Sequence, residues 1–356
     1  MQNKQIIIFH PDIFRHKTNN EYTIKIYNII SKYYEVKSLE WFIKHPFAKE
    51  IRALYLNWYE NTVGKPKVIA QKIQYFIKIL ILRLAKRRKI KICYVIHNKT
   101  PHNISKDTTL YRRATKPFLI NALSISDIIV ELCEHTENYL ITEFDKIDIS
   151  SKICLVPHGK YTKYDCNPNL FREKYRINNH ELLFAYIGKM DKYKNIDIII
   201  QAFNLANINC KLLLVGSMEP TYEQSIRKLI VDDKIILDKS YVSDEEMSGL
   251  MQTADAIILP YENTSLNSGI MINAFSNGTT VIGTKIEMLE DYPSELVYGY
   301  SYIDREKHIM ELSKTMAEAY YNNSQSTIKS KGKELQKIIE KQNDWAEVER
   351  KLLIFL

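Results

Sequence analysis

The chain has 356 residues, which exceeds the size of most single hydrophobic cores and so favours two domains. Its 45% hydrophobic and 26% charged residues are typical of a globular protein and exclude a largely disordered chain or a coiled coil. No run approaches the roughly 20 apolar residues of a membrane-spanning helix, and no secretory signal pattern begins the sequence. The five cysteines are scattered, without a close pair, which favours reduced thiols and no zinc site. We therefore expect a cytoplasmic protein.

Positive charge is concentrated in the first part of the chain. Residues 1–160 carry 27 Lys and Arg against 14 Asp and Glu, a net charge of +13. Residues 161–356 carry 23 against 28, a net charge of −5, and the two parts sum to +8. Eight of the ten glycines lie in the second part. We expect the basic part to meet an anionic partner and the second part to form tight turns beside a ligand.

Short β-branched runs alternate with helical patterns along the whole chain. Because these runs are apolar on both faces, they predict parallel strands covered by helices on both sides. Two successive sets predict an α/β fold with two doubly wound domains, which bind ligands at the carboxyl ends of their strands. The predicted strands are Lys4–Phe9, Ile92–Ile96, Asp127–Leu132 and Ile153–Val156, then Leu182–Ile187, Lys211–Val215, Lys234–Leu237, Ala256–Leu259 and Thr280–Ile282.

Residues 64–91 predict a basic amphipathic helix. Such a helix either packs its apolar face on the core or lies on an anionic membrane surface, and the pattern leaves both open. No basic-aromatic module for nucleic acid is found, so no nucleic-acid partner is expected. The apolar residues at helical spacing are Ile69, Ile73, Phe76, Ile77, Leu80 and Leu84.

A glycine turn follows the predicted strand Leu182–Ile187. Gly188 and Lys189 come directly after the strand, and Lys194 precedes the next helical pattern. Glycine lets a backbone approach a phosphate, and two lysines on one side suit a diphosphate. Taken alone, the pattern equally fits a turn with surface lysines.

The run from 254 to 284 predicts an anion site at the start of a helix. A buried strand ends at Pro260, a polar loop with Ser265 follows, and a helix begins near Ser268-Gly269. The unpaired N–H groups and the dipole of a helix start attract anions. A capped helix without a ligand remains the alternative.

Six short pieces follow one another in order between residues 156 and 283. They are Pro157-His158-Gly159; Tyr186-Ile187-Gly188-Lys189 with Lys194; Leu213-Leu214-Val215-Gly216; Ser240-Tyr241-Val242; Ala254 to Tyr261; and Ser276 to Ile282. This series resembles the C-terminal domain of GT-B glycosyltransferases, the group 1-like enzymes of bacterial capsule, exopolysaccharide and O-antigen synthesis. The resemblance implies two Rossmann-like domains facing across a cleft.

The resemblance also implies a division of the chain. Residues 1–157 would form the acceptor-binding domain and residues 158–335 the nucleotide-sugar-binding domain. Residues 336–356, with Trp345, would form a C-terminal helix that returns to the first domain.

By position in that family, the donor site falls on the second domain. Lys189 and Lys194 would contact the donor phosphates. The loop around Tyr241 would face the nucleotide base, and Gly188 would let the backbone approach the ligand. The helix start would offer N–H groups at Ser268, Gly269 and Ile270.

One departure from the family concerns two glutamates that many of its members carry with seven residues between them. Ser265 and Asn273 stand at these positions. Asn273 can still bond the ribose hydroxyls, and Glu262, the only carboxylate in the loop, can substitute for the first glutamate. The missing pair favours an inverting over a retaining reaction.

The acceptor side is assigned to the first domain. His97 and Asn98 follow a predicted strand and resemble a motif of bacterial polysaccharide glycosyltransferases, with His102 a few residues further on. His97 can bond the donor sugar or carry a proton, whereas Asn98 and His102 suit acceptor contacts; His97 can also be structural. Asp12, after the first strand, is the predicted general base.

The alternatives to Asp12 remain open. The competing groups for the base are Glu131, Glu134 and His135, and Asp12 itself can equally be a helix or turn cap.

The resulting hypothesis is a glycosyltransferase that moves a sugar from a UDP- or GDP-sugar to a glycan acceptor. We expect this acceptor to be lipid-linked and to lie at the inner membrane face. No cofactor or metal is expected, because no Asp-x-Asp triplet occurs and cations with helix dipoles can stabilise a leaving diphosphate. The alternatives are a sugar-nucleotide epimerase of the same architecture and a non-catalytic glycosyltransferase partner subunit.

Overall fold

The computed structural model describes residues 4–15, 20–62, 68–101, 108–262 and 265–356. The chain divides into two compact units. Unit 1 comprises Met1–His158, Thr264–Asn267 and Trp345–Leu356, and unit 2 comprises Gly159–Asn263 and Ser268–Asp344. Within the described residues, no helix has both the length and the apolar character needed to cross a bilayer.

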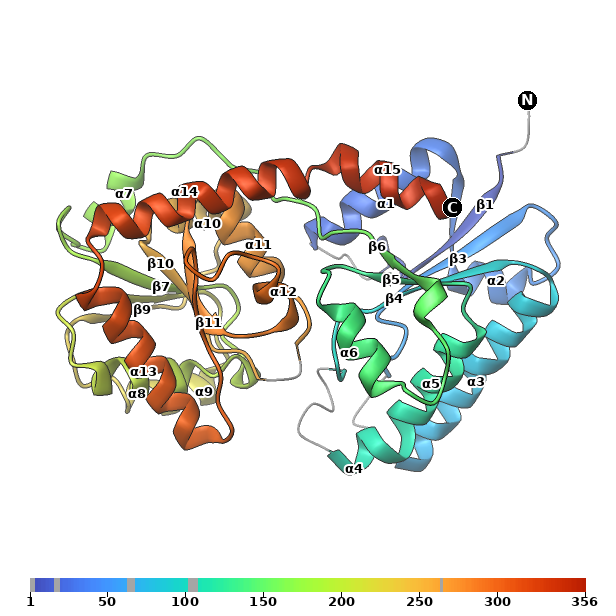
Figure 1. Ribbon diagram of the computed structural model, residues 1–356, viewed down its shortest axis with the longest axis horizontal. Helices are drawn as coiled ribbons and strands as arrows, with labels where there is room; N and C mark the ends of the chain where they lie inside the picture. Colours follow the sequence, from blue (N-terminus) through green and yellow to red (C-terminus); the bar gives the residue numbers. More distant parts are fainter. Residues whose placement is uncertain (1–3, 16–19, 63–67, 102–107, 263–264) are drawn as a thin grey trace. The chain divides into compact units, whose positions relative to one another are not determined.

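Unit 1 is built on a six-stranded parallel sheet in the order β2-β1-β3-β4-β5-β6 (Figure 1). The strands are β1 (Ile6–His10), β2 (Glu35–Ser38), β3 (Ile51–Asn57), β4 (Lys91–Val95), β5 (Ile128–Glu131) and β6 (Ile153–Leu155). The helices are α1 (Glu21–Tyr33), α2 (Leu39–Lys44), α3 (Val68–Arg87), α4 (Thr108–Leu110), α5 (Lys116–Ile125), α6 (Thr136–Glu143) and α15 (Trp345–Phe355), with a π-helical turn at Tyr111–Thr115. Alternate strand residues pack on α2, α3, α5 and α6, which therefore cover one face of the sheet.

Unit 2 repeats this plan with a six-stranded parallel sheet in the order β12-β11-β10-β7-β8-β9. The strands are β7 (Leu183–Ile187), β8 (Lys211–Val215), β9 (Ile235–Asp238), β10 (Ala256–Leu259), β11 (Thr280–Thr284) and β12 (Tyr298–Tyr300). The helices are α7 (Pro168–Lys174), α8 (Ile196–Ala206), α9 (Pro220–Arg227), α10 (Asp244–Thr253), α11 (Gly269–Ser276), α12 (Glu287–Glu290), α13 (Arg305–Tyr321) and α14 (Gln325–Gln342). Each unit is therefore a doubly wound α/β domain, as predicted.

Three strands of the structure are not among those predicted from the sequence. β3 runs through the middle of its sheet between β1 and β4, whereas β2 and β12 lie at sheet edges. β2 has no fully buried residue and β12 has only three residues, so neither produces a strong apolar run. β3 is buried along nearly its whole length, but Arg52 interrupts its apolar sequence near the start and Asn57 ends it.

The last helices divide differently from the expected segment 336–356. Residues 336–342 continue α14 inside unit 2, and only the chain from Trp345 onward belongs to unit 1. There, α15 lies beside α1 (Figure 1), where Glu349 accepts from Lys32 Nζ at 2.6 Å and from Tyr33 Oη at 2.7 Å.

Helix α3 exposes the apolar residues that the periodicity selected. Its buried face instead consists of Gln71, Tyr75, Ile79, Leu82 and Ala85. The prediction that the apolar stripe packs against the core is therefore wrong for most of its residues. The side chains that face outward are Ile69, Ile73, Phe76, Ile77 and Leu80.

Candidate functional site

Two glycines open the carboxyl end of β7 and β8 in unit 2. Gly188 has a φ of 128°, and a Cβ added there would lie 3.7 Å from Cδ1 of Ile270, so this turn faces the start of α11. Gly216 has a φ of 142°, and a Cβ there would lie only 2.0 Å from the carbonyl oxygen of Gly188. The backbone conformation disfavours a side chain at both positions, and Gly216 is buried against Gly188. Gly188 itself is only half-buried, so its backbone is accessible to a ligand beside the start of α11.

Lys194 lies beside this turn between two aromatic rings. A short 3₁₀ turn, Lys192–Lys194, ends at Asn195, whose side chain donates to the carbonyl of Pro260 at 2.9 Å. The ammonium of Lys194 is 5.0 Å from the ring centre of Tyr193 and 5.1 Å from that of Tyr261. Burial lowers the pKa of Lys194 to about 8, although nearby Asp191 acts in the opposite direction. A partly desolvated ammonium of this kind gains from an anionic ligand.

The predicted helix start is confirmed at α11. Ser268 caps the helix by accepting from the N–H of Met271 at 3.1 Å, and its hydroxyl is also hydrogen-bonded to that of Tyr261. Gly269 and Ile270 form the first helical positions, whose N–H groups have no partner within a helix. Gly188, Lys194 and this helix start therefore form what we call the donor cradle, a set of groups suited to an anion.

Other predicted donor residues have engaged or exposed side chains. Lys189 is 71% exposed and pairs with Asp191 at 3.1 Å, and Tyr241 is 73% exposed. Asn273 is buried, and its Oδ1 accepts from Nδ2 of Asn277 at 2.8 Å. The amide oxygen of Asn273 is thus occupied within unit 2. Glu262 is half-buried in the loop after β10.

In unit 1, His97 follows β4 and is buried rather than exposed. Its Nε2 lies 3.0 Å from Oδ1 of Asn57, and its ring stacks on Trp58 with ring centres 3.9 Å apart. Asn57 also donates to the carbonyl of His10 at 3.1 Å, which joins the ends of β1, β3 and β4. Trp58 has a φ of 47°, an unfavourable value for a large side chain. These contacts hold the His97 ring in place at the carboxyl end of β4, and its catalytic role stays a prediction.

A short loop of unit 1, residues 265–267, contacts the chain that follows the carboxyl end of β4. Asn267 donates to the carbonyl of His97 at 2.8 Å, and Asn98 forms a β-bridge with Ser265. Leu266 is fully buried in the core of the unit. The backbone of Asn98 is therefore used structurally, while His102 lies outside the described residues.

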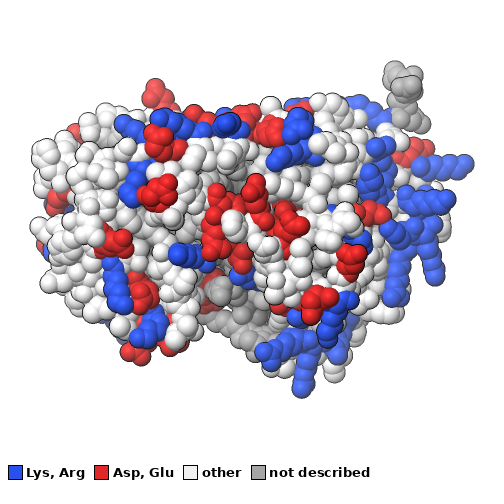
Figure 2. Space-filling view, viewed as in Figure 1, with Lys and Arg blue, Asp and Glu red and all other residues white. Residues whose placement is uncertain are grey.

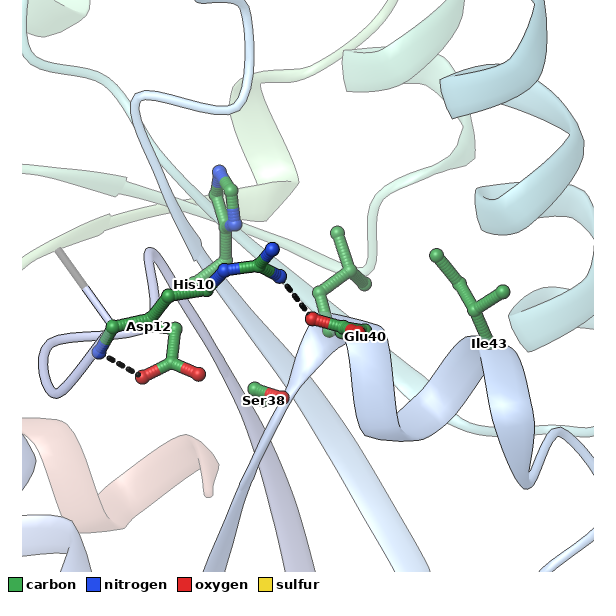
Figure 3. Close-up of a pocket in the computed structure, with 7 residues that line it drawn as sticks. His10, Asp12, Ser38, Glu40 and Ile43 are labelled. Carbon is green, nitrogen blue, oxygen red and sulfur yellow. Dashed lines mark hydrogen bonds and ion pairs between the residues drawn. The ribbon is translucent and has the colours of Figure 1, made fainter.

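Asp12 lines a pocket of about 240 Å³ at the carboxyl ends of β1 and β2 (Figure 3). Its Oδ1 accepts from the N–H groups of Phe14 and Arg15, each at 3.1 Å, so Asp12 caps the turn after β1. Arg15 in turn pairs with Glu40 across the pocket. The described residues that line it are His10, Asp12, Arg15, Ser38, Leu39, Glu40 and Ile43.

Two residues that shape these sites are not predicted by the sequence patterns. Tyr261 ends the piece Ala254 to Tyr261, but nothing in the sequence indicates that its ring contacts Lys194. Asn57 lay in the missed strand β3, so its link to His97 had no signal. Among the described residues, no group of three or more His, Cys, Asp or Glu is arranged to bind a metal, and the expected independence of a metal stays a prediction.

Comparisons with known proteins identify the class. Residues 168–344 match the family model for Glycosyl transferases group 1. HepE of Anabaena, solved in complex with UDP, superposes with a TM-score of 0.70 at 10% identity, covering 99% of this chain and 98% of that one. A glycosyltransferase from Rickettsia africae superposes with a TM-score of 0.62 at 13% identity, and the match covers 100% of this chain and 98% of that one. Sucrose-phosphate synthase from Thermosynechococcus elongatus superposes with a TM-score of 0.62 at 15% identity, and the match covers 88% of this chain and 75% of that one.

The search of curated proteins finds no significant match. The fold is GT-B, with two parallel α/β domains, and the chain carries a glycosyltransferase group 1 domain. The protein is thus an enzyme of the glycosyltransferase class, as the sequence resemblance implied.

Proposed function

We propose that this enzyme transfers a sugar from a nucleotide-diphosphate sugar, with UDP as the nucleotide, to a glycan acceptor. The observation that carries the proposal is the donor cradle, where Lys194 and the start of α11 lie beside the Gly188 turn. The choice of UDP is supported by HepE of Anabaena, which was solved with UDP and with UDP-glucose.

The acceptor is proposed to enter the pocket around Asp12. Its lining combines carboxylate, guanidinium and hydroxyl groups, which suit the hydroxyls of a sugar. We propose Asp12 as the general base, because among the described residues no donor contacts its Oδ2. Asp12→Asn keeps an acceptor for the turn, so lost turnover at unchanged donor affinity would support this role, whereas unchanged turnover would exclude it.

The wider setting is also a proposal. The acceptor is a lipid-linked glycan of bacterial cell-surface polysaccharide synthesis, and the enzyme acts at the cytoplasmic face of the membrane. The net charge of +13 over residues 1–160 supports an anionic acceptor or surface.

A thermal-shift screen with UDP, GDP, CMP, ADP and dTDP tests the donor class. A ligand at about 100 times its dissociation constant adds about 2.7 kcal/mol of stability, a readily measured rise in melting temperature. We expect UDP to give the largest rise, with or without EDTA. A larger rise with another nucleotide would correct the base, and no rise with any of them would contradict the proposal.

The epimerase alternative predicts conversion of the sugar without an acceptor. Proton NMR of UDP-glucose incubated with the enzyme alone separates the two reactions. A transferase leaves the configuration at C2 to C5 of the sugar unchanged, also where it transfers the sugar to water. Signals of a sugar inverted at one of these carbons would favour the epimerase.

A further inference from the structure

The outward face of α3 carries apolar and cationic side chains that do not pack against the core of unit 1. Its inner face, with Tyr75 and Leu82, already packs in the core of unit 1. On the outer face, Ile69 is 75% exposed and Phe76 is 61% exposed. The complete apolar stripe is Ile69, Ile73, Phe76, Ile77 and Leu80. Five large exposed apolar residues within three turns of one helix are unusual for a surface that faces only water.

Cations border this stripe. Lys72 lies beside its first turns, and Arg83 and Arg87 continue the same face toward the end of the helix. Within the described part of the chain, none of these three forms an ion pair with a carboxylate. The helix itself contains no Asp or Glu. This face is therefore both apolar and positively charged.

The charge extends beyond α3 to the neighbouring π-helical turn. Arg112 and Arg113 are exposed there, on a segment that packs against α3. Figure 2 shows Lys and Arg side chains along the lower and right-hand margin of unit 1, where Figure 1 draws α3 and α4. A flat anionic surface with an apolar interior complements this distribution more completely than a small ligand does.

We infer that the outer face of α3 is a docking surface for an anionic lipid bilayer. The apolar stripe inserts at the level between headgroups and acyl chains, while Lys72, Arg83 and Arg87 contact lipid phosphates. Since the inner face stays packed on the sheet, unit 1 docks without unfolding. The inference rests on this surface alone and does not depend on the donor cradle.

Vesicle co-sedimentation with the full chain, without nucleotide, tests the inference. We expect binding to phosphatidylglycerol vesicles and little binding to pure phosphatidylcholine. Replacing both Arg83 and Arg87 with Gln is expected to weaken binding about thirtyfold, because each cation near the surface contributes about 1 kcal/mol. The pair Ile73→Ser and Phe76→Ser is expected to reduce binding at least tenfold at unchanged melting temperature, since both side chains are exposed.

Matched controls come from unit 2. Ile303 is 87% exposed, and Lys333 is exposed on α14, so Ile303→Ser and Lys333→Gln remove one apolar group and one cation elsewhere. Both are expected to leave vesicle binding unchanged. Absence of binding to anionic vesicles would overturn the inference, as would equal losses in the control variants. The inference would also be overturned if the wild type self-associates and the α3 variants become monomeric while they bind vesicles as before. In that case a second copy of the chain covers this face.

Discussion

Replacing Asp255 with alanine is expected to lower the free energy of unfolding by about 3–5 kcal/mol. Asp255 precedes β10, is fully buried, and accepts from the N–H of Leu183 at 2.7 Å. Its carboxylate also lies 3.4 Å from Nη2 of Arg172 and 3.6 Å from Nζ of Lys329. Without it, the buried guanidinium of Arg172 and the partly buried ammonium of Lys329 lose their anion, and a buried strand N–H loses its acceptor.

Chemical denaturation of three variants measures this effect. Asp255→Asn keeps the shape of the side chain while removing its charge, so a loss nearly as large as that of Asp255→Ala would assign the effect to the ion pairs. Asp233→Ala, at an exposed position, is expected to change stability by less than about 0.5 kcal/mol. A loss below about 1 kcal/mol in Asp255→Ala would contradict the role of this cluster.

Replacing Lys194 with alanine is expected to weaken UDP binding about 10- to 100-fold. A hydrogen bond to a charged group contributes about 1.5–3 kcal/mol, and Lys194 is the cation that lies between the Tyr193 and Tyr261 rings beside the Gly188 turn. Lys192→Ala is the matched control, because Lys192 lies in the same turn but is exposed. Isothermal titration calorimetry gives both affinities, and equal affinity in the wild type and Lys194→Ala would remove Lys194 from the donor cradle.

The affinity for UDP is also expected to depend on pH through Lys194. Burial lowers its pKa to about 8 in the free protein, so the ammonium is charged below that pH and loses its proton above it. UDP binding should therefore weaken as the pH rises from about 7.5 to 9.5. In Lys194→Ala this dependence should disappear, and a wild-type affinity that stays constant over the range would contradict the assignment.

The fold could be predicted because parallel strands buried on both faces leave nearly continuous apolar runs. β7, β8 and β10 are of this kind, with every residue or all but one fully buried. Edge strands such as β2 could not be predicted, since their exposed residues carry no such signal. α3 illustrates a different limit, because periodicity identifies an apolar face but not whether that face packs on the core or lies outward.

The candidate sites were predictable where chain order defines them. The capped start of α11 and the glycine turn after β7 follow from local sequence. Contacts between distant segments do not follow from local sequence. Tyr261 contacts Lys194 although it lies 67 residues further along the chain, and Asn57 and His97 are 40 residues apart. His97 shows the consequence, since its position at a strand end was correct while its burial against Trp58 depended on a strand that the pattern did not reveal.

A crystal structure of the enzyme soaked or grown with UDP tests the central claim most directly. We expect density for the diphosphate beside Gly188, within hydrogen-bond distance of Nζ of Lys194 and of the N–H groups at the start of α11. Density for UDP at another place on unit 2, with the donor cradle empty at saturating nucleotide, would contradict the account.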